Sequence, residues 1–182
     1  MSADSVREIK ALDRRIAGLV GKAQRSAAKL KFRRICSLDD GATIAKQTYA
    51  GIYFIEMRVD RERFKSVDAW IDHFRDRWEN DRPRRHFTPG IKQGRVARHQ
   101  TLRKWMPFYL GIRKTAVADR VNEHIGLRAR ANTGGLKLAC RRNIKLSDFR
   151  LSTIQLELKE YDAMMPKIER ALRNRLNPIT GN

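Results

Sequence analysis

The stretch from Phe108 to His124 constrains the fold most, because it begins with residues typical of a β-strand and ends with residues typical of a helix. Aromatic and apolar residues lead up to Gly111, and Thr115 is a good N-cap for the helix that follows. Within this helix Arg120 and His124 are four residues apart, so their side chains project together from one face. An arginine and a histidine held side by side after a strand-to-helix turn can receive a phosphate group.

A second run of aromatic and β-branched residues predicts another strand upstream, around Thr48–Val59. This run contains Gly-Ile-Tyr at 51–53, and the later strand contains Tyr-Leu-Gly at 109–111. Followed by an arginine and a histidine one helical turn apart, these tripeptides resemble the GIY-YIG nuclease family. That family packs a three-stranded antiparallel sheet against helices and hydrolyses phosphodiester bonds with one divalent metal ion. The resemblance implies the same fold and chemistry here, with catalytic roles for Tyr53, Tyr109, Arg120 and His124.

The family also carries a glutamate on a later helix, often followed by a tail that contains proline. The segment 166–181 resembles this element, with Glu169 on the helix and Pro178 in the tail. The resemblance implies that Glu169 is catalytic and holds the metal ion. Mg²⁺, with Mn²⁺ as the alternative, keeps several waters and needs only one or two carboxylates. The family's asparagine after the proline corresponds to Asn177, to Asn182 or to neither.

Phosphodiester hydrolysis needs an activated water, charge stabilisation on the phosphorus oxygens and help for the leaving oxygen. Arg120 can offer two parallel donors to a non-bridging oxygen. The resemblance implies that the Tyr53 hydroxyl positions or deprotonates the attacking water. Deprotonation requires a nearby cation, because an unperturbed tyrosine has a pKa of about 10. His124 either shares in proton transfer or holds a tyrosine in place. The structural alternative is that both tyrosines are half-buried strand residues and Glu169 is an exposed helix residue.

The charge of the chain indicates a polyanionic partner. The 182 residues suffice for one domain, and 40 Lys+Arg against 20 Asp+Glu give a net charge of +20. Cations that neutralise phosphates release counterions, so we expect DNA as the partner, with RNA as the alternative. No long uncharged apolar run or signal peptide is present, which predicts no membrane segment and a cytoplasmic or nucleoid location. Cys36 and Cys140 form no metal-binding pattern and are interpreted as reduced thiols.

Residues 1–40 are predicted to form a basic helical arm, with the helix running from Ser5 to about Phe32. An apolar stripe repeats along it at intervals of three and four residues: Ile9, Leu12, Ile16, Leu19 and Ala23. We expect this stripe to dock on the protein's own domain, and a dimerisation arm is the alternative. The chain is accordingly predicted to be a monomer or a homodimer.

The nuclease-like domain is predicted to span 46–182, with a long insertion at about 61–104 between its first two strands. The first half of the insertion predicts a helix, capped by Ser66 and ended by Pro83, whose aromatic stripe belongs to the core. The second half has no acidic residue and predicts a basic loop that clamps DNA. The predicted nucleic-acid contacts are Arg82, Arg84, Arg85, Lys92, Arg95, Arg98, Arg103, Lys104, Arg113, Lys114, Arg128 and Arg130.

The third strand is predicted from the alternating run 149–158, and the last helix from Ala163 or Pro166 onwards. The sequence thus predicts an α+β fold, in which a small three-stranded antiparallel sheet is flanked by helices. The predicted function is metal-dependent endonuclease cleavage of DNA. The alternatives are a nucleic-acid-binding protein on the same fold without cleavage, and a basic architectural DNA-binding protein.

Overall fold

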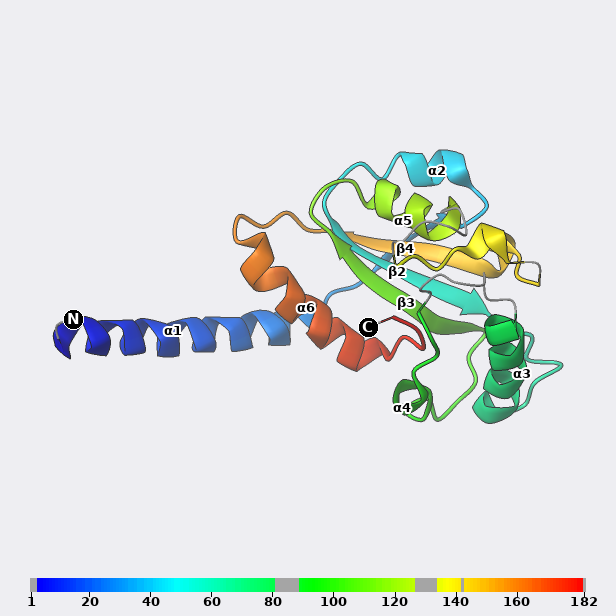
Figure 1. Ribbon diagram of the computed structural model, residues 1–182, viewed down its shortest axis with the longest axis horizontal. Helices are drawn as coiled ribbons and strands as arrows, with labels where there is room; N and C mark the ends of the chain where they lie inside the picture. Colours follow the sequence, from blue (N-terminus) through cyan, green and yellow to red (C-terminus); the bar gives the residue numbers. More distant parts are fainter. Residues whose placement is uncertain (1–2, 81–88, 127–133, 142, 182) are drawn as a thin grey trace.

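The computed structural model describes residues 3–80, 89–126, 134–141 and 143–181, and it shows an α+β fold (Figure 1). Its centre is a four-stranded antiparallel sheet in the order β1-β4-β2-β3. The strands are β1 (Arg33–Ser37), β2 (Gly51–Arg58), β3 (Trp105–Arg113) and β4 (Phe149–Gln155). The α-helices are α1 (Ala3–Ala27), α2 (Gly41–Ala45), α3 (Val67–Asn80), α4 (Gln93–Val96), α5 (Val117–Gly126) and α6 (Tyr161–Leu176).

The α+β class is confirmed, but the prediction of a three-stranded sheet is wrong. The predicted strands correspond to β2, β3 and β4, and the additional strand, β1, pairs with the outer side of β4. Arg33 and Arg34 fall within the predicted basic arm at 1–40, whereas helix α1 already ends at Ala27. Both arginines are exposed on an edge strand. Charged side chains are common on such edges, so this strand lacks the apolar alternation of a buried one.

Each face of the sheet carries its own apolar cluster, because successive side chains of a strand point to opposite faces. Tyr53 and Ile55 point into the larger cluster, which also contains Val117 and Val121 of α5. Phe54 points into the smaller cluster, formed with α6 and with the end of α1. Figure 1 shows α2 and α5 on one side of the sheet and α6 on the other. Helices α5 and α6 are therefore separated by the sheet.

The first half of the insertion forms α3, as predicted. The Ser66 hydroxyl accepts a hydrogen bond from the Ala69 N–H at 3.2 Å, which confirms the predicted cap. Trp70, Phe74 and Trp78 are buried, with successive rings stacked 5.8 and 5.7 Å apart. Their prediction as core residues is confirmed.

The described part of the second half of the insertion is anchored to the C-terminal tail. The Lys92 N–H donates to the Ile179 carbonyl at 2.8 Å, and Ile91 forms a β-bridge with Thr180. The Thr180 N–H in turn donates to the carbonyl of Phe108 on β3. The tail therefore runs between the edge of β3 and the insertion, and it holds this segment against the core.

The first part of α1 projects from the body as an arm (Figure 1). Its end is anchored by Ala27, which is buried against α6. Ile9, Leu12, Ile16 and Leu19 are more than half exposed, so the prediction that this stripe docks on its own domain is wrong. Among the described residues α1 is the longest helix, yet neither it nor any other helix is apolar enough over a sufficient length to span a membrane.

Candidate functional site

Tyr53 and Tyr109 are brought together by the antiparallel pairing of β2 with β3. Tyr53 lies opposite Gly111, and Ile55 lies opposite Tyr109, so both tyrosines point to the same face of the sheet. Their rings stack with centroids 6.0 Å apart and planes inclined by 21°. Tyr53 is 1% exposed and Tyr109 is 9% exposed.

The two glycines of the tripeptides are required by close approaches rather than by special backbone angles. A Cβ atom at Gly111 would lie 2.2 Å from the Tyr53 hydroxyl oxygen, which occupies the space above this glycine. A Cβ atom at Gly51 would lie 2.1 Å from the carbonyl oxygen of Ile154 on β4. Gly111 therefore makes room for Tyr53 of the other tripeptide, and Gly51 allows β2 to approach β4 closely.

Helix α5 places His124 against both tyrosines. The His124 side chain is fully buried, and its Nε2 atom lies 2.8 Å from the Tyr53 hydroxyl oxygen. The His124 and Tyr109 rings are 4.5 Å apart. At the start of α5, the N–H groups of Val117 and Ala118 already donate to carbonyls of the segment before β2. These two N–H groups are therefore already paired and are not free to bind a ligand.

The hydrogen bonds of His124 determine its tautomer. The Leu136 N–H donates to Nδ1 at 3.1 Å, so Nδ1 carries a lone pair and the proton of the neutral ring is on Nε2. Burial, and then the positive charge of Arg120, lower the pKa of His124 to about 3. The ring is consequently neutral at physiological pH, and its Nε2–H donates to the Tyr53 hydroxyl oxygen.

The Tyr53 hydroxyl stays protonated in this environment. Burial raises its pKa well above the usual range, Tyr109 adds to the rise, and the nearby Arg120 only partly opposes it. The cation that could activate this tyrosine as a base is present, but the effect of burial outweighs it. Because the Tyr53 oxygen accepts from His124, the hydroxyl proton of Tyr53 points away from the His124 ring.

Arg120 is held in place by two acceptors on its own side of the sheet. Its guanidinium forms an ion pair with Glu123 and donates to the Gly134 carbonyl at 3.2 Å. The Glu123 carboxylate also forms an ion pair with Arg113, with Oε1 of Glu123 4.0 Å from Nη2 of Arg113. Glu123 was not among the predicted site residues, although its position three residues after Arg120 on a helix predicts such a pair.

A buried arginine supports the peptide that orients His124. Arg141 lies 3.2 Å above the Trp78 ring and donates to the Trp78 carbonyl at 2.8 Å. Its Nε also donates to the Leu136 carbonyl at 3.3 Å, and Leu136 supplies the N–H that binds His124. Neither Leu136 nor Arg141 was predicted. The hydrogen bond to His124 uses the Leu136 backbone, so residue types carry no signal for it.

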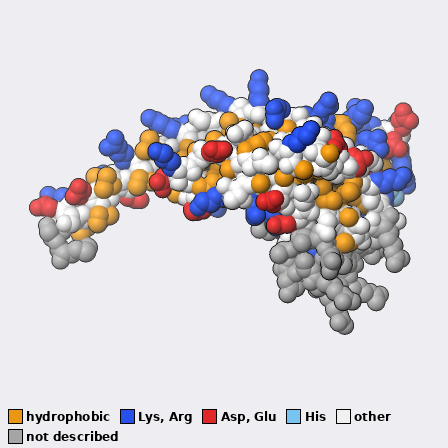
Figure 2. Space-filling view, turned by 90° about the horizontal axis from the view of Figure 1, so that it is seen from above, with side chains coloured by type: hydrophobic (Ala, Val, Ile, Leu, Met, Phe, Trp, Pro, Cys, Tyr) orange, Lys and Arg blue, Asp and Glu red, His pale blue; other side chains and the backbone are white. Residues whose placement is uncertain are grey.

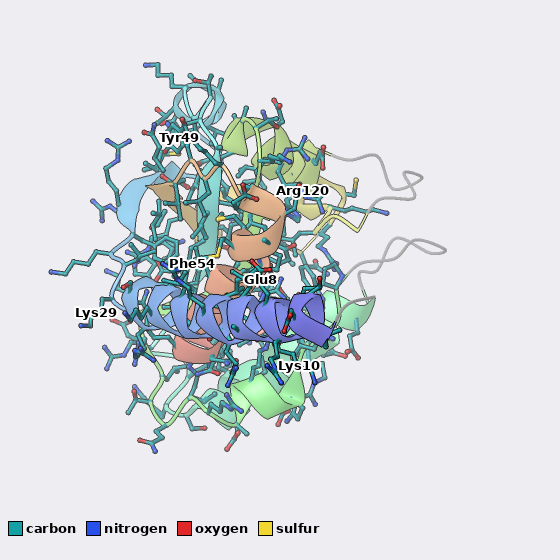
Figure 3. The ribbon with its side chains drawn as sticks, turned by 90° about the vertical axis from the view of Figure 1, so that its left-hand side faces the viewer. Glu8, Lys10, Lys29, Tyr49, Phe54 and Arg120 are labelled. Carbon is teal, nitrogen blue, oxygen red and sulfur yellow. The ribbon has the colours of Figure 1, made fainter. Side chains whose placement is uncertain are left out.

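Glu169 does not join the cluster formed by Tyr53, Tyr109, Arg120 and His124. It lies on α6, across the sheet from α5, and within the described residues it makes no hydrogen bond or ion pair with those four. Its Oε1 accepts from Arg173 at 2.6 Å. Phe54, which is labelled with Arg120 in Figure 3, packs in the apolar cluster on the face that α6 covers.

The surroundings of Glu169 are rich in arginine. An open pocket of about 450 Å³ is lined by Arg95, Pro166, Glu169, Arg170, Arg173 and Asn174. Burial raises the pKa of Glu169, and Arg173 and Arg95 oppose this rise. The C-terminal tail passes between this pocket and the tyrosines, because Arg95 donates to the Pro178 carbonyl and Gly181 lies against the Tyr109 ring.

Of the two asparagines that could correspond to the family's asparagine, only Asn177 lies within the described residues. Asn177 ends α6 in the left-handed conformation, with φ 49°, and its N–H donates to the Arg173 carbonyl. Its carbonyl is 2.8 Å from Nε2 of His99, so this residue has a structural role. Asn182 lies outside the described residues.

The predicted nucleic-acid contacts are only partly within the described chain. Lys92, Arg98, Arg103, Lys104 and Lys114 are exposed, and Arg95 and Arg113 are half-buried. Figure 2 shows lysine and arginine side chains spread along the arm and the body on the face viewed from above. The residues outside the described ranges are Arg82, Arg84, Arg85, Arg128 and Arg130.

Comparisons of the chain with protein-family models, with curated proteins and with solved structures gave no match.

Proposed function

We propose that the chain is a phosphodiesterase that cleaves DNA and belongs to the GIY-YIG type. The observation that supports this most is the gathering of Tyr53, Tyr109, Arg120 and His124, from two paired strands and one helix, at one place. These residues lie within a chain whose net charge of +20 suits a polyanionic substrate. Chance matches of two tripeptides would not require a shared hydrogen-bond network.

Within this proposal Arg120 binds a non-bridging phosphate oxygen. Its ion pair with Glu123 fixes the guanidinium plane, so less conformational freedom is lost when a phosphate binds. Tyr53 donates its hydroxyl proton to a phosphate oxygen or to the attacking water, because its pKa is raised and its oxygen is occupied by His124. It positions a reactant and does not act as the base. His124 maintains this direction of donation, since its Nε2–H cannot accept a proton.

The metal ion fits the Glu169 pocket only together with a phosphate group. Oε2 of Glu169 makes no hydrogen bond within the described residues and can be a ligand, and Mg²⁺ tolerates one protein carboxylate. The described residues contain no group of three or more His, Cys, Asp or Glu suited to a metal ion. Arg95, Arg170 and Arg173 would repel a bare divalent cation, and a bound phosphate would offset this repulsion. When bound, the ion would supply positive charge and an activated water.

A DNA-binding protein without cleavage is the second candidate. It is favoured by the position of Glu169, which forms its ion pair with Arg173 and has no polar contact with the tyrosine cluster in the described structure. Exposed cations of the insertion would supply the same affinity in either case, because phosphate contacts do not require the catalytic residues. Location in the cytoplasm or nucleoid is part of the same proposal.

The deciding experiment is nicking of supercoiled plasmid with Mg²⁺, together with DNA binding measured in chelator. We expect the wild-type protein to nick, Arg120→Gln to lose about 100-fold or more in rate together with some affinity, and Glu169→Gln to lose cleavage while it still binds. Arg7→Gln and Glu157→Gln are the charge-matched controls, since both residues are exposed and lie outside the cluster. An RNA duplex of the same sequence tests the alternative substrate.

If the folded wild-type protein cuts no DNA of any form but binds it, the second candidate is correct. If Arg120→Gln behaves like Arg7→Gln in both assays, the cluster is not the phosphate site.

A further inference from the structure

The apolar stripe on α1 is left uncovered by the residues that the structure describes. Ile9, Leu12, Ile16 and Leu19 are 51–59% exposed, and they are the large hydrophobic side chains that are exposed in the described structure. Soluble proteins expose single apolar residues routinely, but an ordered row of them on one helix face marks a contact surface. Figure 2 shows hydrophobic side chains along the projecting part of α1.

The helix itself also requires a partner. From Asp4 to Leu19 every described side chain of α1 is exposed except Val6, which is half-buried. Most of the stability of helices in proteins comes from packing of an apolar face rather than from helix propensity. Gly18 and Gly21 weaken this helix further. A surface that buries the stripe would supply the missing stabilisation.

We propose that the partner is a second copy of this chain, and that the two α1 helices pair in antiparallel orientation. In this arrangement Ile9 packs against Leu19 of the second copy, and Leu12 packs against Ile16 of the second copy. The spacing of three and four residues is that of two helices wound around each other. The proposal is independent of whether the chain cleaves DNA.

The charges beside the stripe favour the antiparallel orientation. One flank carries Asp4 and Glu8 in its first half and Arg15 and Lys22 in its second half. Antiparallel pairing places Glu8 next to Lys22 of the second copy at both ends of the contact. Parallel pairing would place Glu8 next to Asp13 of the second copy, which is repulsive. Asp13 and Arg15, next to the two-fold axis, meet their own copies in the antiparallel pair, which is repulsive, but the two Glu8–Lys22 contacts offset this repulsion. The parallel pair has no such attractive contact.

The charge of the whole protein supports the same orientation. Each chain carries +20, so two bodies placed side by side would repel each other. With the two-fold axis near Arg14, each body begins at Ala27, and the helix rise places the two bodies roughly 40 Å apart. In Figure 3, Glu8 and Lys10 label the part of α1 that projects from the body, and Lys29 labels the chain just after α1, where it joins the body.

The first test is the solution mass of the full chain, freed of nucleic acid, over a concentration series in light scattering or sedimentation. We expect the mass to approach twice the 21.2 kDa of one chain as concentration rises. The double variant Leu12→Gln/Ile16→Gln should raise the dissociation constant at least about tenfold. Lys10→Gln/Arg14→Gln, on the opposite face of the helix, is the control and should leave it unchanged.

The second test determines the orientation. Glu8→Lys alone and Lys22→Glu alone should each weaken the dimer by about two- to tenfold, and the double exchange should restore it. Both residues are exposed, so neither change threatens the fold of the body. A wild-type protein that remains monomeric at all concentrations overturns the proposal. A stronger dimer for Glu8→Lys alone overturns the antiparallel orientation, because in a parallel pair that change would replace repulsion by attraction.

Discussion

Acidification should destabilise the protein in part through His124, a histidine that is buried in the neutral form. Its ring is fully buried, and burial together with Arg120 lowers its pKa to about 3, whereas in the unfolded chain its pKa is near 6.5. Between these values the unfolded state binds a proton that the folded state excludes, so the free energy of unfolding falls as the pH falls through this window. Integrating from pH 7 to pH 5 gives a loss of about 2 kcal/mol from this group.

The measurement is urea unfolding at pH 7 and pH 5, followed by the fluorescence of the tryptophans, of which Trp70 and Trp78 are buried. His124→Gln is the reference, because it carries all other titrating groups and lacks this one. Between pH 7 and pH 5 we expect the free energy of unfolding to fall by about 2 kcal/mol more in the wild type than in the variant. For a chain of this size this difference corresponds to roughly 4–8 °C in Tm. An equal pH dependence in both proteins would refute the buried neutral histidine and the tautomer derived from it.

Three further outcomes follow from the described contacts. Gly111→Ala should abolish any plasmid nicking and lower the free energy of unfolding, because the added methyl would collide with the Tyr53 hydroxyl. Gly94→Ala is the control: its methyl would meet no atom within 4 Å, so nicking and stability should be unchanged. Arg141→Gln should shift the ¹⁵N resonances of His124 and raise its pKa towards 6.5, since the Leu136 peptide would lose its support; unchanged resonances would contradict this. Replacing the exposed cations of the insertion with serine should weaken DNA binding for all sequences and make the DNA affinity less dependent on salt concentration. If the salt dependence is unchanged, the insertion does not clamp DNA. Those cations are Lys92, Arg98, Arg103 and Lys104.

The tyrosine cluster suggests why the tripeptide glycines and the buried histidine occur together. Gly111 leaves space for the Tyr53 hydroxyl, and His124 donates to that hydroxyl from the helix that packs over it. A larger residue at position 111 or a shift of α5 would disturb the same hydrogen bond. One geometric requirement therefore links residues from β2, β3 and α5.

Local patterns were sufficient to predict several elements. The apolar periodicity of α3, its cap at Ser66 and its aromatic core face are all confirmed, because a helix face and its first turn depend on neighbours three and four residues away. The same local rule placed Arg120 and His124 on one side of α5. Pairing of two strands was predicted through the tripeptides, and β2 does lie antiparallel to β3.

Only the tertiary structure decided the rest. The exposed edge strand β1 has no apolar alternation, so its place in the sheet depends on pairing with β4, more than a hundred residues away in the chain. The tautomer of His124 depends on a backbone N–H, which every residue except proline provides, and the raised pKa of Tyr53 depends on burial by several elements. The spacing of the apolar residues in the α1 stripe is compatible with packing on its own domain and with packing on a second chain. Its exposure is a consequence of where α1 leaves the body, which no local pattern in the sequence encodes.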